Sequence, residues 1–197
     1  MRGVEQVPWL YDALCAVADR LGLARWRRWL AQGARGRTLE VGCGTGRNLT
    51  LYTPAARVVG LDPSLDALRR ARRRAPRTPL VAATAGALPF RDRAFDTLVS
   101  SLVFCTVPDP AHGLSEARRV LAAGGQLRML EHVRSTTPWK ARWQDRLQPL
   151  WTRVSGGCHP NRDTEAAVAA ARFLIDPGQR RARGHLRRFV AHPRLES

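Results

Sequence analysis

Three glycines and one aspartate have the spacing of a nucleotide-cofactor site. Gly42, Gly44 and Gly46 follow apolar residues within the segment LEVGCGTGRNL, residues 39–49. Asp62 lies twenty positions beyond Gly42, at the end of a second apolar run. A glycine-rich turn after a strand lets backbone N–H groups approach a ligand, and an acidic residue after the next strand can accept hydrogen bonds from ribose hydroxyls. The pattern therefore predicts a cofactor with a nucleoside part.

Two histidines are candidates for moving a proton. His132 lies at the end of the strand predicted over residues 126–133, and His159 lies in the turn SGGCHPNRD. Ligands of open α/β sheets bind beyond the carboxyl ends of the strands, and an imidazole there can act as a base. We expect His132 and His159 as candidate catalytic bases, with a purely structural histidine as the alternative in each case.

The elements that must position these residues alternate between strand and helix. Strands are predicted at residues 37–41, 57–61, 80–83, 96–104 and 126–133. Helices are predicted at residues 8–31, directly after Gly46, and at 65–75, 111–121, 138–151 and 164–172. This alternation indicates βαβ units. We expect an α/β fold, a Rossmann-like, doubly wound and mostly parallel sheet with helices on both faces.

The C-terminal part departs from this pattern. An aromatic stripe at helical spacing favours a core position over a pocket; it comprises Trp139, Trp143, Leu147, Leu150 and Trp151. Residues 173–176 and 189–191 are predicted edge strands, and the arginine-rich residues 177–188 are poor strand formers. At the other end, the helix of residues 8–31 is either a packing helix or a lid.

Composition restricts the class of protein. The 197 residues are 44% hydrophobic and 25% charged, which is typical of one globular domain. The net charge is +17, and Lys140 is the sole lysine among 33 basic residues. Such an excess of arginine reflects coding bias as readily as selection for nucleic acid, and we favour a solvated basic surface. Attraction to an anionic membrane surface stays open.

Cysteine usage and hydropathy predict the compartment. Cys15, Cys43, Cys105 and Cys158 lie far apart without a CxxC pair. This spacing argues against a disulfide framework and against a metal site, so no metal is expected. No signal-peptide core and no transmembrane segment are found. We therefore expect a soluble, cytoplasmic protein, with peripheral membrane contact as the remaining option.

Two cofactor classes fit poorly. Dinucleotide enzymes have GxGxxG, in which the third glycine comes five positions after the first, whereas Gly46 comes four after Gly42. The phosphate-binding pattern GxxxxGK[ST] is absent, since no lysine precedes Lys140.

Four ordered motifs resemble those of class I S-adenosylmethionine (SAM)-dependent methyltransferases. They are LEVGCGTGRNL, VVGLDPS (58–64), ALPFRDRAFDTLVSSLVFCTVPDP (87–110) and EARRVLAAGGQLRMLEH (116–132). The resemblance covers about residues 8–172. Within that superfamily the chain is similar to the ubiquinone-biosynthesis-like branch with phospholipid and thiol methyltransferases, some of which share the pattern EHV…W…W…GC.

This resemblance implies SAM as cofactor, S-adenosylhomocysteine as product, and a set of binding residues. The methionine end would lie against Glu40, Gly42, Cys43, Gly44 and Gly46. The ribose would bind Asp62, and the adenine would lie near Pro63, Thr84 and Ala85. Phe104 would line the pocket near the methyl group. Thr84 stands where relatives often have an aspartate, which implies weaker adenine discrimination.

The resulting hypothesis is one SAM-dependent methyltransferase domain over residues 1–197. It comprises an N-terminal helical cap (1–35), a SAM-binding core (36–134) and an acceptor side (135–197). The acceptor would be a small, lipophilic or aromatic molecule with an O, S or N nucleophile, because tryptophans suggest an aromatic-lined pocket. The alternatives are an RNA methyltransferase and a SAM-binding regulator without catalysis. The strand-four motif of amino-methylating nucleic-acid enzymes is absent.

Overall fold

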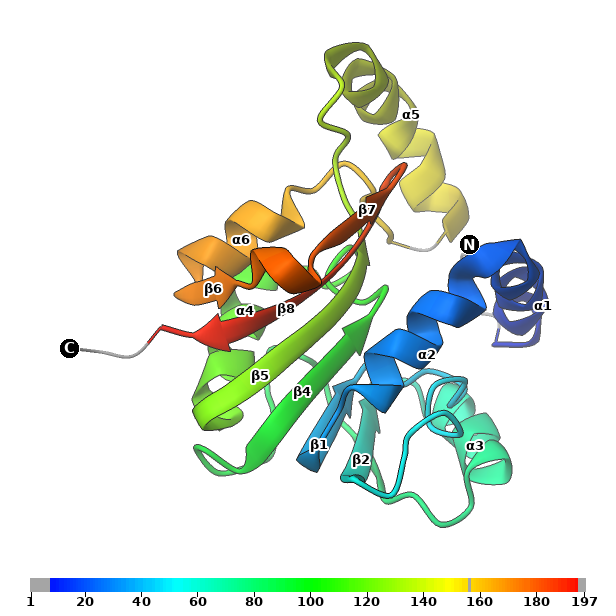
Figure 1. The fold of residues 1–197 in the computed structure, drawn as a ribbon. Coiled ribbons are helices and arrows are strands. Elements are labelled where there is room, and N and C mark those ends of the chain that lie inside the picture. The colour runs from blue at the N-terminus through cyan, green and yellow to red at the C-terminus, as the bar shows by residue number, and fades with distance from the viewer. Residues whose placement is uncertain (1–7, 156, 195–197) are drawn as a thin grey trace.

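One mixed sheet with helices on both faces forms the centre of the molecule (Figure 1). The structure is a computed structural model that describes residues 8–155 and 157–194. The strands are β1 (Gly36–Val41), β2 (Ala56–Asp62), β3 (Leu80–Ala82), β4 (Phe95–Ser101), β5 (Leu121–His132), β6 (Phe173–Ile175), β7 (Arg181–Arg183) and β8 (Leu186–Pro193). The helical elements are α1 (Pro8–Ala18), η2 (Asp19–Leu23), α2 (Ala24–Gln32), α3 (Leu65–Arg74), α4 (Pro110–Val120), α5 (Pro138–Ser155), α6 (Thr164–Ala170) and η3 (Pro177–Gln179).

The strand order confirms the predicted doubly wound sheet. The order is β3-β2-β1-β4-β5-β8-β6, with β7 paired to β8. Strands β1 to β5 are parallel, and β8 is antiparallel to β5, β6 and β7. The order reverses between β1 and β4, so the segments that follow these two strands flank a crevice at the carboxyl edge.

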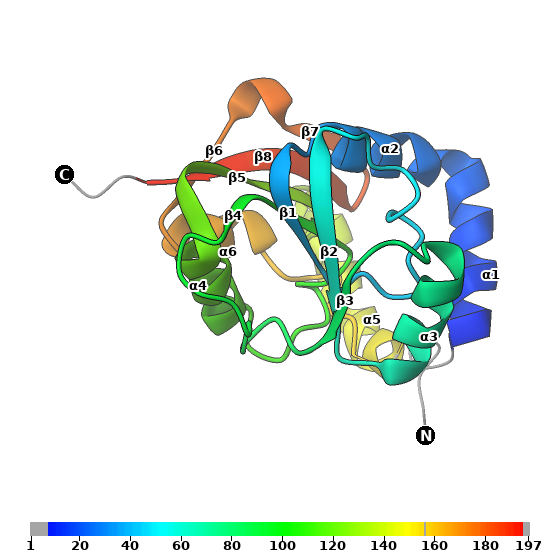
Figure 2. The same ribbon diagram turned by 90° about the horizontal axis from the view of Figure 1, so that it is seen from below.

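Alternating side chains pack the two faces of the sheet. Leu98 of β4 contributes to the core shared with α4 and α6, while the next residue, Val99, packs with Leu30 of α2. Figures 1 and 2 show α4 and α6 against one face and α2 against the other. Ser64 caps α3: its hydroxyl accepts a hydrogen bond from the Ala67 nitrogen at 3.2 Å.

The prediction of one helix over residues 8–31 is wrong. Gly22 has a φ of 111°, which L side chains rarely adopt, and this residue separates α1 from α2. A Cβ at this position would also lie 2.6 Å from Nη1 of Arg183. The side chains of Leu10, Leu14 and Leu21, on which the predicted apolar face depended, lie outside the described residues.

The helix expected directly after Gly46 is replaced by a series of turns. The nitrogen of Leu49 donates to the Gly46 carbonyl at 3.2 Å, and that of Leu51 donates to the Asn48 carbonyl at 2.8 Å. These three-residue spacings are tighter than those of an α-helix. The side chain of Asn48 donates to the buried Glu40 carboxylate instead of facing solvent, so local polar bonds hold the chain in this form.

Two predicted boundaries also move. Strand β4 ends at Ser101 rather than at residue 104, because Leu102 has a φ of 60° and turns the chain away from the sheet. Helix α4 ends at Val120, and β5 starts at Leu121 rather than at residue 126, so Gly124 lies within β5 with a φ of 76°. The β4–β5 register shifts beside it, so this glycine accommodates an irregularity of the strand.

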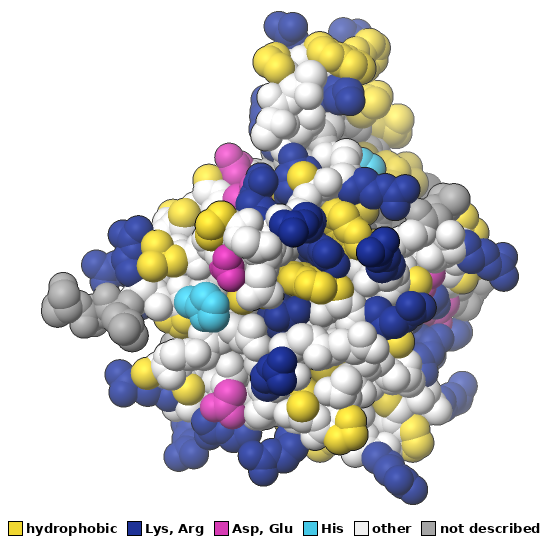
Figure 3. Space-filling model, in the orientation of Figure 1, with side chains coloured by type: hydrophobic (Ala, Val, Ile, Leu, Met, Phe, Trp, Pro, Cys, Tyr) yellow, Lys and Arg dark blue, Asp and Glu magenta, His cyan; other side chains and the backbone are white. Residues whose placement is uncertain are grey.

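The aromatic stripe of α5 is exposed rather than buried in a core. Its large apolar side chains are between 49% and 64% exposed; they are Trp139, Trp143, Leu147, Leu150, Trp151 and Val154. Figure 3 shows hydrophobic and basic side chains mixed over this helix at the top of the view. Helix α5 stands away from the sheet (Figure 1), which explains why its apolar spacing did not predict burial.

The arginine-rich residues 177–188, predicted to be poor strand formers, contribute to β7 and β8, and the predicted strand of residues 189–191 lies within β8 rather than at an edge of the sheet. Residues 181–183 are β7, and β8 starts at Leu186 and pairs with β5 inside the sheet. The guanidinium of Arg188 lies 4.4 Å from the ring of Trp29 and 5.4 Å from that of Trp26. Stacking on these rings gives the charged side chain a place on the α2 face of the sheet.

Candidate functional site

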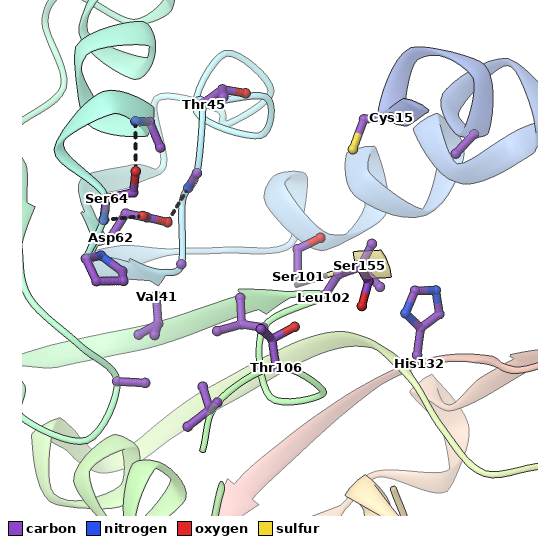
Figure 4. A pocket seen from close by; sticks show the side chains of 18 of the residues that line it. Cys15, Val41, Thr45, Asp62, Ser64, Ser101, Leu102, Thr106, His132 and Ser155 are labelled. Atoms are coloured by element: carbon purple, nitrogen blue, oxygen red, sulfur yellow. Dashed lines mark hydrogen bonds between the residues drawn. The ribbon is translucent and has the colours of Figure 1, made fainter. Parts of the chain in front are cut away.

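A cavity of about 1510 Å³ lies at the carboxyl edge of the parallel strands. Its walls come from α1, η2, the segments after β1, β2, β3, β4 and β5, the end of α5 and the β7–β8 turn. Figure 4 shows Asp62 at one end of this cavity and His132 at the other. Small-molecule pockets commonly measure ~300–1,000 Å³, so the volume accommodates two ligands side by side.

The first end of the cavity is organised by the carboxylate of Asp62. Its Oδ2 accepts a hydrogen bond from the Gly44 nitrogen at 2.9 Å, and its Oδ1 accepts one from the Ser64 nitrogen at 2.9 Å (Figure 4). Burial raises the pKa of Asp62, while the hydrogen bonds from Ser64 and Gly44 oppose that rise. Each carboxylate oxygen has a further lone pair, which can accept a ligand hydroxyl.

The glycine turn needs its glycines for two reasons. Gly42 has a φ of 65°, and a Cβ there would lie 2.4 Å from Val103 Cγ2. Gly46 has a φ of 79° and packs against Ala71 of α3. Gly42 and Gly44 line the cavity, whereas Gly46 supports the turn from behind.

Glu40 is buried behind this turn and does not line the cavity. Its carboxylate accepts hydrogen bonds from Asn48 Nδ2 and from the Tyr52 hydroxyl, both at 2.9 Å. Burial raises the pKa of Glu40 to about 7, and the bonds from Tyr52 and Asn48 limit the rise. Strand alternation explains the placement: Leu39 and Val41 point to the α4 face, so Glu40 points to the opposite one.

The remaining predicted cofactor residues separate into two groups. Pro63, Thr84 and Ala85 line the cavity beside Asp62. Cys43 and Phe104 do not line it: the Cys43 side chain packs against α3, and Phe104 is 1% exposed in the main core. The turn after Ser101 directs the Phe104 ring into the core. The prediction that the Phe104 side chain lines the pocket is therefore wrong.

A buried glutamate orders the segment after β4. Glu131 Oε1 accepts hydrogen bonds from Ser100 Oγ at 2.9 Å, from the Val103 nitrogen at 3.0 Å and from the Phe104 nitrogen at 3.1 Å. Burial raises the pKa of Glu131, and these donors oppose the rise. Successive backbone N–H groups around one carboxylate fix the loop that separates the two ends of the cavity.

The two predicted bases are placed differently. His132 lines the cavity, and its Nδ1 lies 3.7 Å from the Cys158 sulfur. Its Nε2 has no hydrogen-bond partner among the described residues. His159 is not part of the cavity wall; its Nδ1 lies 2.6 Å from the Gly157 carbonyl, and its backbone nitrogen donates to the Cys105 carbonyl at 2.7 Å.

Two cysteines that the sequence placed far apart meet beside His132. One ligand atom each of Cys105, Cys158 and His132 lies within 4.8 Å of the others. The contact with Cys105, followed by that with His132, lowers the pKa of Cys158, while the Cys158 contact and burial raise the pKa of Cys105.

Several cavity residues escaped sequence reasoning. They are Cys15, Trp26, Leu102, Thr106, His112 and His185. The His185 ring lies 5.2 Å from that of His132, and burial followed by the neighbouring imidazole lowers the pKa of His185. His185 belongs to a C-terminal segment with no apolar pattern, so the local sequence did not predict its place in the cavity.

The N-terminal helix is tied to the glycine turn by charge. Asp12 Oδ1 accepts a hydrogen bond from Thr45 Oγ1 at 2.6 Å, and Asp12 Oδ2 pairs with Arg74 at 3.3 Å. Asp19 pairs with Arg27 at 3.2 Å and also with Arg47. These contacts set α1 against the donor end of the cavity; that α1 acts as a lid stays a prediction.

The switch-point cavity, the glycine turn after β1 and the acidic end of β2 define a Rossmann-like enzyme that binds a nucleoside cofactor. The methyltransferase domain family Methyltransf_11 matches residues 39–129. Human thiol S-methyltransferases TMT1B and TMT1A are 32% and 34% identical over 181 and 143 residues. These matches cover 84% and 68% of this chain, and 74% and 59% of the two relatives.

A lipid-modifying relative and a solved structure agree with this assignment. Phosphatidylethanolamine N-methyltransferase of Cereibacter sphaeroides is 39% identical over 103 residues, 49% of this chain and 51% of that protein. A SAM-dependent methyltransferase of Thermotoga maritima has the same fold, with a TM-score of 0.66 and 21% identity over 92% of this chain and 97% of that one. The chain belongs to the class I SAM-dependent methyltransferases, and SAM is its cofactor. It spans less than two thirds of TMT1A and about half of the bacterial enzyme.

None of the helices in the described residues has the length and apolar character needed to cross a membrane.

Proposed function

We propose that the protein transfers a methyl group from SAM to the thiol of a small lipophilic acceptor. The observation that carries this proposal is the single cavity with a donor end at Asp62 and an acceptor end at His132. The names of the human relatives TMT1B and TMT1A support a thiol as the nucleophile, and the bacterial relative makes a lipid amine the runner-up.

At the donor end, Asp62 would accept the ribose hydroxyls with its remaining lone pairs. Pro63, Thr84 and Ala85 line the neighbouring wall, where the adenine would lie. The backbone of Gly42 and Gly44 would face the methionine end, because neither residue has a side chain to keep the ligand away. Thr84 offers a hydroxyl without charge for adenine recognition.

Apolar side chains form part of the wall at the acceptor end. Leu102, Val107, Trp151 and Val154 line this part together with His132. The exposed apolar face of α5 continues from Trp151 and Val154 toward Trp143. A lipophilic acceptor would thus pass along an apolar surface into an apolar cavity, which supports this substrate class.

The chemistry requires little covalent participation by the protein. When bound, SAM supplies an electrophilic methyl group on a positively charged sulfur that leaves as a neutral thioether. The cavity residues hold the acceptor sulfur in line with that methyl group and exclude water. His132 would accept the thiol proton at Nε2 as the new carbon–sulfur bond forms.

A methyl-transfer screen tests the proposal. Purified protein and SAM are mixed with alkyl thiols, phenols, quinols, phospholipid amines or RNA, and release of S-adenosylhomocysteine is measured. We expect release with thiols and none with an Asp62→Ala variant. Release with another acceptor alone would reassign the substrate, and release with RNA alone would favour the nucleic-acid alternative that the +17 charge suggests. SAM binding without release in any mixture would favour a regulator.

A further inference from the structure

Three soft metal ligands converge beneath the acceptor end of the cavity. Cys105 lies in the segment after β4, His132 is the last residue of β5, and Cys158 lies in the segment after α5. Their ligand atoms all lie within 4.8 Å of one another, and the Cys158 sulfur lies 3.7 Å from His132 Nδ1. Both thiols are 1% exposed, and both cysteines are free.

The cluster is held in place by backbone hydrogen bonds. The Cys105 carbonyl accepts from the His159 nitrogen at 2.7 Å, which ties the first cysteine to the neighbour of the second. The Cys158 nitrogen donates to Ser155 Oγ at 3.1 Å, and its carbonyl accepts from Thr152 Oγ1 at 3.0 Å. These hydrogen bonds hold both cysteines in place, so the grouping does not depend on a bond between the two sulfurs.

The donor types fit a zinc site, as does the separation between the Cys158 sulfur and His132 Nδ1. Zn²⁺ binds thiolate sulfur at ~2.3 Å and imidazole nitrogen at ~2.0–2.1 Å, which places ligand atoms of a tetrahedral site about 3.5–3.8 Å apart. The measured distance of 3.7 Å between Cys158 and His132 falls in this range. Two thiolates and one imidazole leave a fourth position, as in catalytic zinc sites.

We propose that Cys105, Cys158 and His132 bind one Zn²⁺ ion, with the fourth position directed to the cavity. The wall in front of the cluster supports this direction: His132 itself lines the cavity, and so does Thr106, whose hydroxyl lies 3.7 Å from the Cys105 sulfur. Cys43, at the donor end, lies outside the cluster.

The location suggests what the ion does, and this part rests on the proposed thiol methylation. A thiol that enters the fourth position loses its proton to solvent, because coordination to zinc deprotonates a thiol. The coordinated sulfur is then the nucleophile that takes the methyl group of SAM. In this loaded state His132 is a ligand, and it serves as the base only in the metal-free protein.

Metal binding is tested without any reference to turnover. The reduced, metal-free protein is titrated with Co²⁺, and its Zn²⁺ content is measured after loading and dialysis. We expect one ion per chain and the thiolate-to-cobalt charge-transfer band with the visible bands of tetrahedral Co²⁺. Cys105→Ser and Cys158→Ser should each weaken binding by at least ~100-fold, since loss of mere supporting contacts already costs 10–100-fold. Cys43→Ser, a buried cysteine outside the cluster, should bind like the wild type.

Further measurements keep the proposal open to refutation. If a serine variant does not fold, a mercurial titration of the wild type should release Zn²⁺ to a metallochromic dye as two thiols react. Absence of a tetrahedral cobalt spectrum in the reduced wild type would overturn the site, as would a Cys105–Cys158 disulfide that persists in reductant. A loaded protein that binds SAM but methylates no thiol would leave the zinc site standing and refute the proposed function.

Discussion

The carboxylate of Asp62 accepts a hydrogen bond from the backbone nitrogen of Gly44 at 2.9 Å, and so joins the end of β2 to the glycine turn after β1. Its second oxygen accepts from the Ser64 nitrogen, also at 2.9 Å. The same side chain lines the cavity, so the group we propose for the ribose also shapes the turn that faces the methionine end. Substitution of Asp62 should therefore affect both parts of the SAM site.

Asp62→Ala should weaken SAM binding by at least ~100-fold. A hydrogen bond to a charged group contributes about 1.5–3 kcal/mol, and this variant removes the carboxylate that would make two of them. Isothermal titration calorimetry measures the change. Asp92→Asn is the matched control, because Asp92 is exposed and pairs with Arg119 away from the cavity. An unchanged dissociation constant for Asp62→Ala would refute the ribose role.

Glu40 should make the stability of the protein fall as the pH rises. Burial raises the pKa of Glu40 from 4.5 to about 7. Between these values the folded protein binds more protons than the unfolded chain, so the free energy of unfolding decreases with pH. At ~1.4 kcal/mol per pH unit the decrease is on the order of 3 kcal/mol. Urea unfolding between about pH 5 and pH 8 should show it.

Glu40→Gln should flatten this decline, because an amide keeps hydrogen-bonding capacity for Tyr52 and Asn48 but cannot ionise. Glu116→Gln serves as the control. The Arg119 guanidinium lowers the pKa of Glu116, so that carboxylate stabilises the fold above its unfolded pKa and loses this effect as the pH falls. If the free energy of unfolding of Glu40→Gln depended on pH as that of the wild type does, the decline could not be due to ionisation of the buried Glu40 carboxylate.

The exposed position of the α5 stripe predicts small effects on stability. Trp143 and Leu147 are 56% and 52% exposed, so Trp143→Gln and Leu147→Gln should change the free energy of unfolding by no more than ~0.5 kcal/mol. Leu30, a residue of α2 that is 0% exposed, provides the contrast: Leu30→Ala should cost ~2–5 kcal/mol. A loss for Trp143→Gln as large as that for Leu30→Ala would mean that the stripe is buried in solution.

The parts of the fold that sequence could predict are those with local signals. The apolar run of residues 58–61 marks β2, the turn after β1 is marked by glycines, and Ser64 follows the Asp-Pro pair as a helix cap. The donor end of the cavity needs only these elements. Its residues Gly44 and Asp62 come from neighbouring strands, so their meeting follows from strand pairing alone.

The parts that sequence could not predict depend on contacts between distant segments. Cys105 and Cys158 meet because α5 and the loop after it return the chain to the segment after β4. No spacing pattern in the sequence indicates such a contact. Arg188 occupies a strand because its guanidinium stacks on Trp26 and Trp29, which belong to a helix at the other end of the chain. Apolar spacing in α5 indicated a buried face, but its large apolar side chains are about half exposed.

The two histidines predicted as bases should behave differently in the metal-free enzyme. His132 lines the cavity with a free Nε2, whereas His159 lies outside the cavity wall with its Nδ1 beside the Gly157 carbonyl. A general base contributes ~10²–10⁴-fold, so His132→Gln should lower turnover of a weakly acidic alkyl thiol by at least ~100-fold. The loss should be smaller for an acidic aryl thiol, which ionises without help. His159→Gln should keep turnover close to that of the wild type, and SAM affinity should change in neither variant. Steady-state rates with both thiols, after chelation of metal, provide the comparison. Equal losses for the two variants, or a His132→Gln loss that is the same for both thiols, would show that His132 does not act as the base.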